Sequence, residues 1–273
     1  MAHVSHVSDK KNINVACPDG FANQLRLLLA GTFLRLSGNI DSFNQEWILN
    51  NHNNVNFLDY FIPLPKVTMD KIDLSSTEAD QIVTSCSFKA MIETLTDKKQ
   101  EHIPWSNALT LALKYLKLRP EIKELIDLYK EKHDIKNCLG LHVRRTCKTA
   151  ILNNQDKYRL PNSMISNEEI LRLTEEYDKV YLATDNKETQ KWFQKRLQDK
   201  LLVFSEIESG DEKFDNYYDR DLVKRFTTPL HTIIDFFMLK ECGTFLGTSE
   251  SSLSLIIWLW RNNKDDYPVF GRL

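Results

Sequence analysis

The rest of this chain is organised around the segment Gly140-Leu141-His142-Val143-Arg144-Arg145-Thr146. Its apolar residues predict a short buried strand, and two adjacent arginines follow where that strand ends. Ligands of a parallel sheet bind at the carboxyl ends of its strands, where a guanidinium can donate to two phosphate oxygens at once. The alternative is that Arg144 or Arg145 pairs with a buried carboxylate, but the polar loop that follows favours a ligand site.

The chain beyond this stretch alternates between predicted strands and predicted helices. Ser166 and Glu169 form a capping box, the usual start signal of a helix. Such alternation predicts a parallel, doubly wound α/β sheet. Strands are expected at 137–143, 180–183, 201–204 and 244–246, and helices at 166–176, 187–197, 229–241 and after the hydroxyl-rich turn 248–252.

The first half begins with a strand at 13–17, a glycine turn and a helix at 24–37 that Asp19 or Asn23 could cap. A glycine turn at a helix N-terminus suits an anionic ligand, although many βα units look the same. Two further helices are expected, one capped by Ser106 and one that begins at Pro120. We therefore expect an N-terminal domain over 1–135 and a C-terminal domain over 136–273.

The composition is typical of a globular protein and excludes several functional classes. The 273 residues are 42% hydrophobic and 27% charged, and the net charge of -2 gives no reason to expect a nucleic-acid partner. Five scattered cysteines without a Cys-x-x-Cys pair argue against disulfides and a zinc site. The longest apolar stretch, 253–260, is too short to span a bilayer, and no signal peptide is evident, so a cytoplasmic protein is expected.

Polar residues follow three of the predicted strands, at the edge where such a sheet binds ligands. Hydroxyls near the start of the last helix could hold phosphate, although ordinary helix capping explains any one of them equally well. Asp185 could likewise be a turn residue. The three groups together favour a ligand site, and they are Arg144 and Arg145, then Thr184 and Asp185, then Thr248, Ser249, Ser251 and Ser252.

Five segments in the order 20–25, 140–146, 180–185, 233–239 and 247–253 resemble the motifs of the fucosyltransferase superfamily. This superfamily includes α1,6-fucosyltransferases, nodulation fucosyltransferases and protein O-fucosyltransferases. The resemblance implies a GT-B-like α/β fold, in which two Rossmann-like domains with parallel sheets face a cleft. It also implies an inverting transfer of fucose from GDP-fucose to a glycan or other hydroxyl acceptor, with no metal cofactor.

The resemblance implies a role for each matching residue. Arg144 would be the catalytic residue that holds the β-phosphate, and Arg145 would support the loop by pairing inside the domain. Asp235 would accept hydrogen bonds from guanine. The complete nucleotide site would consist of Gly20, His142, Arg144, Asp185, Asp235, Ser251 and Ser252.

Three positions depart from the family pattern, and the general base is not identified. Cys147 stands where the family has Asp, Ala22 replaces a glycine, and Leu253 follows the two serines in place of a polar residue. The general base that activates the acceptor hydroxyl could be Asp19, Glu46, Asp185 or Glu250, with Lys148 as an assistant.

Two other functions fit parts of the sequence. Asp219-Arg220-Asp221 is an Asp-x-Asp pair that could hold a divalent ion under a nucleotide diphosphate, as in a metal-dependent transferase. The same pair also suits a solvated loop. A non-catalytic nucleotide-sugar or glycan-binding module is the second alternative, and Cys147 supports it best. The acceptor, the linkage and the oligomeric state are not encoded in any motif.

Overall fold

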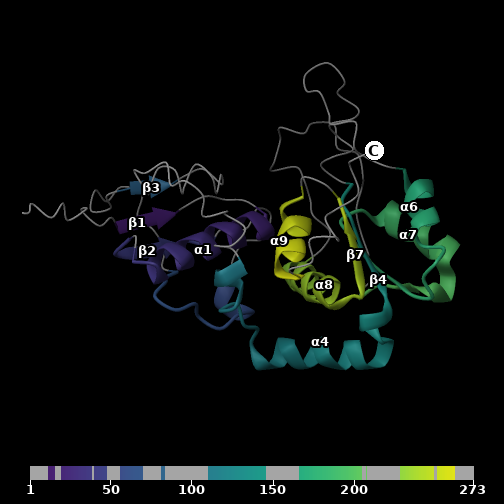
Figure 1. Ribbon diagram of the computed structural model, residues 1–273, viewed down its shortest axis with the longest axis horizontal. Coiled ribbons are helices and arrows are strands. Elements are labelled where there is room, and N and C mark those ends of the chain that lie inside the picture. Colours follow the sequence, from purple (N-terminus) through teal and green to yellow (C-terminus); the bar gives the residue numbers. More distant parts are fainter. Residues whose placement is uncertain are drawn as a thin grey trace, which may run out of the picture. The chain divides into compact units, whose positions relative to one another are not determined.

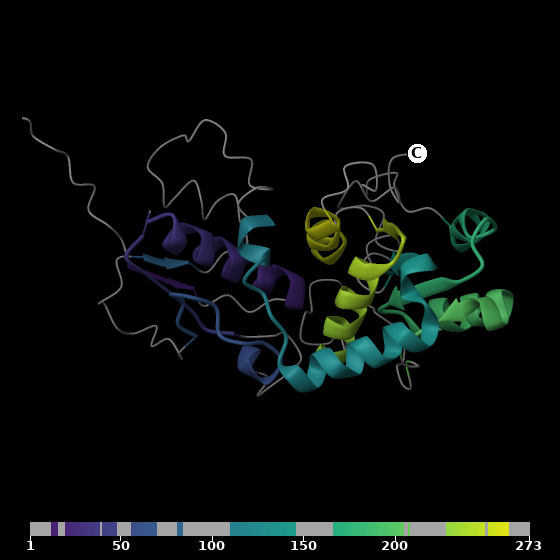
Figure 2. The same ribbon diagram turned by 60° about the horizontal axis from the view of Figure 1, so that its bottom comes forward.

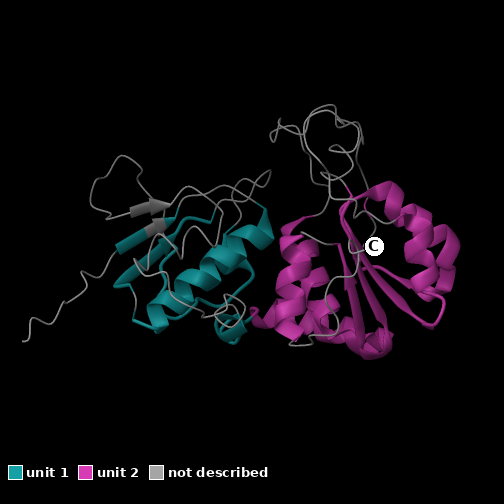
Figure 3. Ribbon diagram, turned by 45° about the horizontal axis from the view of Figure 1, so that its top comes forward, with its two compact units in different colours: residues 1–49, 55–117 teal, residues 50–54, 118–273 magenta. Residues whose placement is uncertain are grey.

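A computed structural model describes residues 12–15, 20–38, 40–47, 56–69, 81–83, 110–145, 166–204, 207, 228–248 and 251–261. The chain forms two compact units, shown in Figure 3. Unit 1 comprises residues 1–49 and 55–117, and unit 2 comprises residues 50–54 and 118–273. None of the helices in the described ranges is long and apolar enough to cross a membrane.

Unit 1 is a parallel sheet with a helix between its first two strands. The strand order is β2-β1-β3, and both neighbours of β1 run parallel to it. A helical turn at 110–113 is the described part of the helix expected after Ser106. The elements are β1 (Asn12–Val15), α1 (Phe21–Leu36), β2 (Ser42–Gln45), η1 (Phe57–Asp59) and β3 (Gln81–Val83).

Helix α1 begins at Phe21, three residues before the predicted start. Gly20 is its N-cap, in extended conformation, so the prediction that Asn23 caps the helix is wrong, and Asp19 lies outside the described residues. The ring of Phe21 is buried and meets Trp47 edge to face at 6.1 Å between centroids. This packing anchors the first turn of α1 to the core of unit 1.

Unit 2 is a four-stranded parallel sheet with helices on both faces (Figure 1). The strand order is β6-β5-β4-β7, which confirms the predicted doubly wound sheet. The central strands β4 and β5 are buried at every position, as expected for a parallel sheet covered on both sides. The elements are α4 (Pro120–His133), η2 (Ile135–Asn137), β4 (Leu139–Val143), α6 (Asn167–Leu173), β5 (Val180–Thr184), α7 (Lys187–Leu197), η3 (Gln198–Lys200), β6 (Leu201–Leu202), α8 (Pro229–Glu241), β7 (Thr244–Gly247) and α9 (Ser252–Arg261).

Two elements are shorter than the sequence predicted, and a hydrogen bond explains each case. Helix α6 ends at Leu173, because the Thr174 hydroxyl donates to the carbonyl of Leu171 at 2.7 Å and closes the last turn. Strand β6 stops after Leu202, because the carbonyl of Val203 accepts from the Tyr129 hydroxyl at 2.8 Å.

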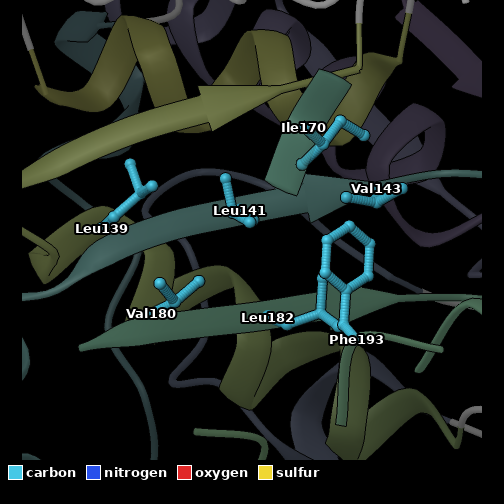
Figure 4. Close-up of a cluster of buried hydrophobic side chains, with 7 residues drawn as sticks. All are labelled: Leu139, Leu141, Val143, Ile170, Val180, Leu182 and Phe193. Atoms are coloured by element: carbon cyan, nitrogen blue, oxygen red, sulfur yellow. The ribbon is translucent and has the colours of Figure 1, made fainter. Parts of the chain in front are cut away.

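Alternate residues of the central strands divide the core of unit 2 into two layers. Helices α6 and α7 cover one face, and Figure 4 shows the buried cluster that joins them to β4 and β5. Its members are Leu139, Leu141, Val143, Ile170, Val180, Leu182 and Phe193. The intervening positions, Gly140, His142 and Tyr181, face α8 and α9. The ligand-binding candidates of β4 therefore lie on the side of α8 and α9.

Helix α4 belongs to unit 2, although the sequence analysis placed it in the first domain. The units divide between residues 117 and 118, not after residue 135. Helix α4 packs against α8, and the two lie side by side in Figure 2. Its Tyr129 ring meets Tyr181 of β5 edge to face at 6.1 Å. The buried face of α4 therefore packs against α8 and the sheet of unit 2.

Candidate functional site

The carboxyl ends of β4, β5 and β7 meet at one edge of the unit 2 sheet. Val143 is paired with Thr184, and His142 is paired with Gly247, so the three strands end in register. The residues that follow these ends are Arg144, Asp185 and Thr248. The three polar groups that the sequence analysis expected at strand ends thus lie at the same edge, where parallel sheets bind ligands.

The hydroxyl of Thr248 ties the end of β4 to the end of β7. Thr248 Oγ1 donates to the carbonyl of His142 at 2.9 Å and accepts from the backbone N–H of Arg144 at 2.9 Å. The backbone N–H of Thr248 also donates to the His142 carbonyl at 2.9 Å. These bonds fix the backbone on both sides of Val143, so they determine the point from which the Arg144 side chain starts.

Thr248→Val removes this hydroxyl and changes the shape of the side chain little, so it tests the two hydrogen bonds of the hydroxyl. We expect the free energy of unfolding to fall by about 1–3 kcal/mol, because the Arg144 N–H loses its acceptor in a partly buried place. Denaturant unfolding measures this loss. Thr248→Ser keeps the hydroxyl and should retain most of the stability.

Thr232→Val is the matched control, since the Thr232 hydroxyl makes an exposed bond to the Thr228 carbonyl at 3.3 Å on α8. Equal losses in the two valine variants would show that the Thr248 hydroxyl has no special role.

Asp185 holds the turn that carries the two arginines. Its Oδ1 accepts from the backbone N–H of Arg145 at 2.8 Å, and its Oδ2 lies 3.9 Å from Nε of Arg144. About a quarter of each of the two paired side chains is exposed, so the ion pair is partly screened from water. These contacts make Asp185 a positioning residue for Arg144, and the nucleotide contact predicted for it stays a prediction.

The side chain of Arg145 is directed into unit 2. Its Nη2 donates to Oδ1 of Asn167, at the first position of α6, at 2.8 Å. Burial lowers the pKa of the Arg145 guanidinium, while the carboxylates of Asp185 and Glu168 oppose that shift. The guanidinium stays charged at neutral pH, since arginine does not deprotonate in proteins. Arg144 and Arg145 thus differ in surroundings: the guanidinium of Arg144 lies beside Asp185, and that of Arg145 donates to Asn167.

His142 is buried on the α9 side of the sheet and is uncharged at neutral pH. Burial and, to a smaller extent, the positive charge of Arg144 lower its pKa to about 4, although Asp185 opposes the shift. Nδ1 of His142 lies 2.7 Å from Oγ of Ser254 on α9. A neutral imidazole can offer one donor and one acceptor, so His142 suits a polar ligand atom better than an ion pair.

Ser251 and Ser252 lie at the start of α9, beside Thr248. The backbone N–H of Ser251 donates to the Thr248 carbonyl at 3.4 Å, and Ser252 is the first residue of the helix. In the described part of the chain, Oγ of Ser251 is buried and has no hydrogen-bond partner. A buried hydroxyl without a partner is costly, and a phosphate oxygen at a helix N-terminus would satisfy it.

Asp235 lies away from the strand ends, on α8, and contacts β5. Its Oδ1 accepts from the Tyr181 hydroxyl at 2.7 Å. Burial raises the pKa of Asp235 to about 7, and the hydrogen bond from Tyr181 opposes that rise. The negative charge of Asp235 also acts on Tyr129 of α4, and burial together with this charge raises the pKa of Tyr129 to about 12. Asp235 is therefore a carboxyl group whose charge changes near neutral pH.

The remaining predicted residues lie in unit 1 or outside the described ranges. Gly20 is buried at the N-cap of α1, and Glu46 follows β2, where its backbone N–H donates to the Val15 carbonyl at 2.9 Å. Within the described ranges, no group of three or more His, Cys, Asp or Glu side chains could hold a metal ion. Positions outside those ranges are Asp19, Cys147, Lys148, Asp219, Asp221, Ser249 and Glu250.

Three residues of the site were missed by reasoning from the sequence. Ser254 and Asn167 contact His142 and Arg145, and Tyr181 donates to Asp235. Ser254 and Asn167 lie in helices, where a hydroxyl or amide gives no local sign of its partner. Tyr181 lies in the predicted strand 180–183, and the sequence gives no sign of the partner of its hydroxyl. The small residue Gly247 beside Ser254 is the one signal that could have suggested a close approach.

No protein-family model and no curated protein matches this chain. Solved structures of similar fold include NodZ α1,6-fucosyltransferase soaked with GDP-fucose, which is 14% identical, with 92% of this chain and 93% of that chain covered and a TM-score of 0.54. NodZ from Bradyrhizobium is 14% identical, with 91% and 92% covered and a TM-score of 0.55. POFUT1 in complex with GDP is 10% identical, with 97% and 99% covered and a TM-score of 0.55. The chain therefore has the GT-B-like α/β fold of these fucosyltransferases, as its sequence motifs led us to expect.

Proposed function

We propose that this chain is an inverting glycosyltransferase that moves fucose from GDP-fucose to a hydroxyl of a glycan or other acceptor, without a metal ion. The observation that carries the proposal is the placement of Arg144. Thr248 and Asp185 hold this arginine at the carboxyl end of β4. Ser251, whose backbone N–H donates to the Thr248 carbonyl, has a buried hydroxyl that lacks a partner in the described ranges. A cation and a hydroxyl at a helix N-terminus suit a diphosphate. Solved structures of POFUT1, which has the same fold, are complexes with GDP or GDP-fucose.

The proposed chemistry is a single displacement at the anomeric carbon of fucose. The acceptor oxygen forms a bond to that carbon while the bond to the β-phosphate oxygen breaks, and the acceptor proton passes to a base. Negative charge builds on the departing GDP in an oxocarbenium-like transition state. A fixed guanidinium that binds this charge more strongly as it grows lowers the barrier, which is the role we assign to Arg144.

The base of the nucleotide would be recognised by Asp235 and His142. The carboxylate of Asp235 can accept from the two N–H groups on the edge of guanine, which uridine and adenosine nucleotides do not present in the same pattern. Its oxygen Oδ1 is already oriented by Tyr181. Gly20 would let the backbone of unit 1 approach the diphosphate, because a glycine has no Cβ to hold it away.

The proposed reaction also needs a general base that takes the proton from the acceptor hydroxyl. Asp185 is poorly suited, because one of its oxygens accepts from the Arg145 N–H and the other lies beside the Arg144 guanidinium, so both are already in use. Glu46 follows β2 in unit 1 and stays a candidate among the described residues. We propose Glu46, Asp19 or Glu250 as the base.

Calorimetric titration of the whole chain with GDP, UDP and GDP-fucose, in the presence of a chelator, tests the proposal. We expect GDP and GDP-fucose to bind, UDP to bind much more weakly, and added Mg²⁺ or Mn²⁺ to change neither result. The double variant Asp219→Asn and Asp221→Asn should bind GDP as the wild type does. Binding that requires a divalent ion, or a preference for UDP, would instead favour a metal-dependent transferase.

Release of GDP from GDP-fucose in the presence of a panel of glycan acceptors then separates an enzyme from a binding module. Tight GDP-fucose binding with no transfer to any acceptor would contradict the proposed activity.

A further inference from the structure

A hydroxyl on α9 is hydrogen-bonded to the ring of His142. Oγ of Ser254 lies 2.7 Å from Nδ1 of His142, and the Ser254 residue has no exposed surface. His142 comes from β4 and Ser254 from α9, so the contact joins the strand that precedes Arg144 to the helix whose N-terminus carries Ser251. The contact is therefore inside the candidate site.

The contact between Ser254 and His142 depends on the absence of a side chain at Gly247. A Cβ at Gly247 would lie 2.5 Å from Oγ and 2.8 Å from Cβ of Ser254, which is too close for any side chain. The missing side chain at the end of β7 lets α9 approach the sheet, and Ser254 then reaches across to the neighbouring strand β4. This close packing holds Ser254 in one position relative to the His142 ring.

The hydrogen bond between Ser254 and His142 favours one tautomer of the His142 ring. A serine hydroxyl has one proton to donate, and within the described ranges His142 Nδ1 is the hydrogen-bond partner of Ser254 Oγ. The ring is neutral, because burial lowers the pKa of His142 to about 4. If Nδ1 carried the ring proton, it would donate to Ser254 Oγ, and the buried serine hydroxyl would lose this acceptor for its own proton, which is unfavourable. If Nε2 carries it, both groups are satisfied.

We propose that Ser254 is a positioning residue that donates to Nδ1 of His142 and holds this histidine as the neutral Nε2–H tautomer. His142 then presents an N–H donor, not an acceptor, to the bound nucleotide. This inference rests on the proposed function for the identity of the ligand, whereas the tautomer itself is a property of the free protein. A donor at this place would select ligand atoms that carry lone pairs, such as the oxygens of phosphate or ribose or the Hoogsteen edge of a purine.

Long-range ¹H–¹⁵N correlation spectra of the protein labelled with ¹⁵N-histidine report the tautomer of each neutral ring directly. The His142 signals are assigned by their absence from the spectrum of His142→Gln. We expect the Nε2–H pattern for His142 in the free wild-type chain, and a mixture of both tautomers in Ser254→Ala. The Nδ1–H pattern in the wild type, or an unchanged pattern in Ser254→Ala, would overturn the proposal.

Calorimetry of GDP binding supplies the second readout. Ser254→Ala should weaken GDP binding roughly three- to tenfold, the range expected for one neutral hydrogen bond. The same substitution in a His142→Gln background should have no further effect, because Ser254 acts through the ring. An equal loss in both backgrounds would overturn the positioning role.

Thr32→Val is the control for the loss of a buried helical hydroxyl, since Thr32 Oγ1 donates to the Leu28 carbonyl at 2.8 Å on α1 of unit 1. It should leave the His142 signals and GDP binding unchanged. Absence of GDP binding to the wild type would refute the proposed function, while the spectra of the free protein would still decide the tautomer.

Discussion

Arg144→Ala is expected to lower the rate of fucosyl transfer by about a thousandfold or more, the range measured when an arginine that stabilises transition-state charge is removed. Arg144 extends from the end of β4, where Thr248 fixes its backbone N–H and Asp185 faces its guanidinium. An uncharged alanine leaves the departing diphosphate without a preorganised counter-charge, and water cannot replace it without reorganising. Transfer kinetics under saturating GDP-fucose measure the effect on kcat, and GDP calorimetry measures the effect on binding.

Two further variants test whether positive charge alone is enough at position 144 and whether the effect is specific to Arg144. Arg144→Lys keeps the positive charge but loses the planar fork that donates to two oxygens, so it should recover only a small part of the activity. Arg196→Ala removes an arginine that lies over the Trp192 ring at 3.6 Å on the exposed side of α7. It should leave transfer unchanged. Turnover of Arg144→Ala near the wild-type rate would refute the assignment of this residue.

GDP binding is expected to weaken as the pH falls through about 7, and Asp235 is the reason. Burial raises the pKa of this carboxyl to about 7, and only its charged form accepts two hydrogen bonds from guanine. The protonated form must lose its proton before it binds, so the dissociation constant should rise by about tenfold between about pH 8 and about pH 6. Asp235→Asn should weaken GDP binding by about 10–100-fold at the higher pH, as for a bond to a charged group.

The comparison of wild type with Asp235→Asn at each pH removes the contribution of the phosphates of GDP, which also titrate near neutrality. Tyr181→Phe provides a second control. The Tyr181 hydroxyl stabilises the charged carboxylate, so its removal should shift the midpoint of the wild-type profile to higher pH. Parallel pH profiles for the wild type and Asp235→Asn would show that Asp235 does not contact the base.

Stability gives an independent check on the same group. The folded-state pKa of Asp235 lies above that of an unfolded aspartate, near 4, so the folded state binds more protons between these values. The contribution of Asp235 to the free energy of unfolding should therefore be present at low pH and lost as the pH rises from about 4 to about 7. Asp235→Asn should remove that dependence.

Local signals in the sequence predicted most elements of unit 2. The capping box of Ser166 and Glu169 starts α6 as expected, and Pro120 and Pro229 occupy the first turns of α4 and α8. Each of these signals acts within one helical turn, so no distant residue needs to be known. The apolar runs of β4 and β5 are equally local, because a strand buried on both faces consists almost entirely of apolar residues.

Errors arose where a distant partner sets the outcome. Phe21 packs against Trp47 and Phe61, and α1 starts earlier than its polar neighbours suggested. The division of the chain near residue 117 places α4 in unit 2, because Tyr129 contacts Tyr181 and Val203, which are far away in the sequence. No local pattern in α4 shows which sheet it covers.

The parallel sheet of unit 2 and the polar groups at the ends of its strands could be predicted from the sequence, because hydrophobic periodicity and caps are properties of neighbouring residues. The contacts that these polar groups make could not be predicted, because they depend on the tertiary structure. The contacts of Thr248 with Arg144 and of Ser254 with His142 join residues more than a hundred positions apart. The geometry and protonation of a buried group depend on which atoms surround it, and packing between strands and helices sets those surroundings.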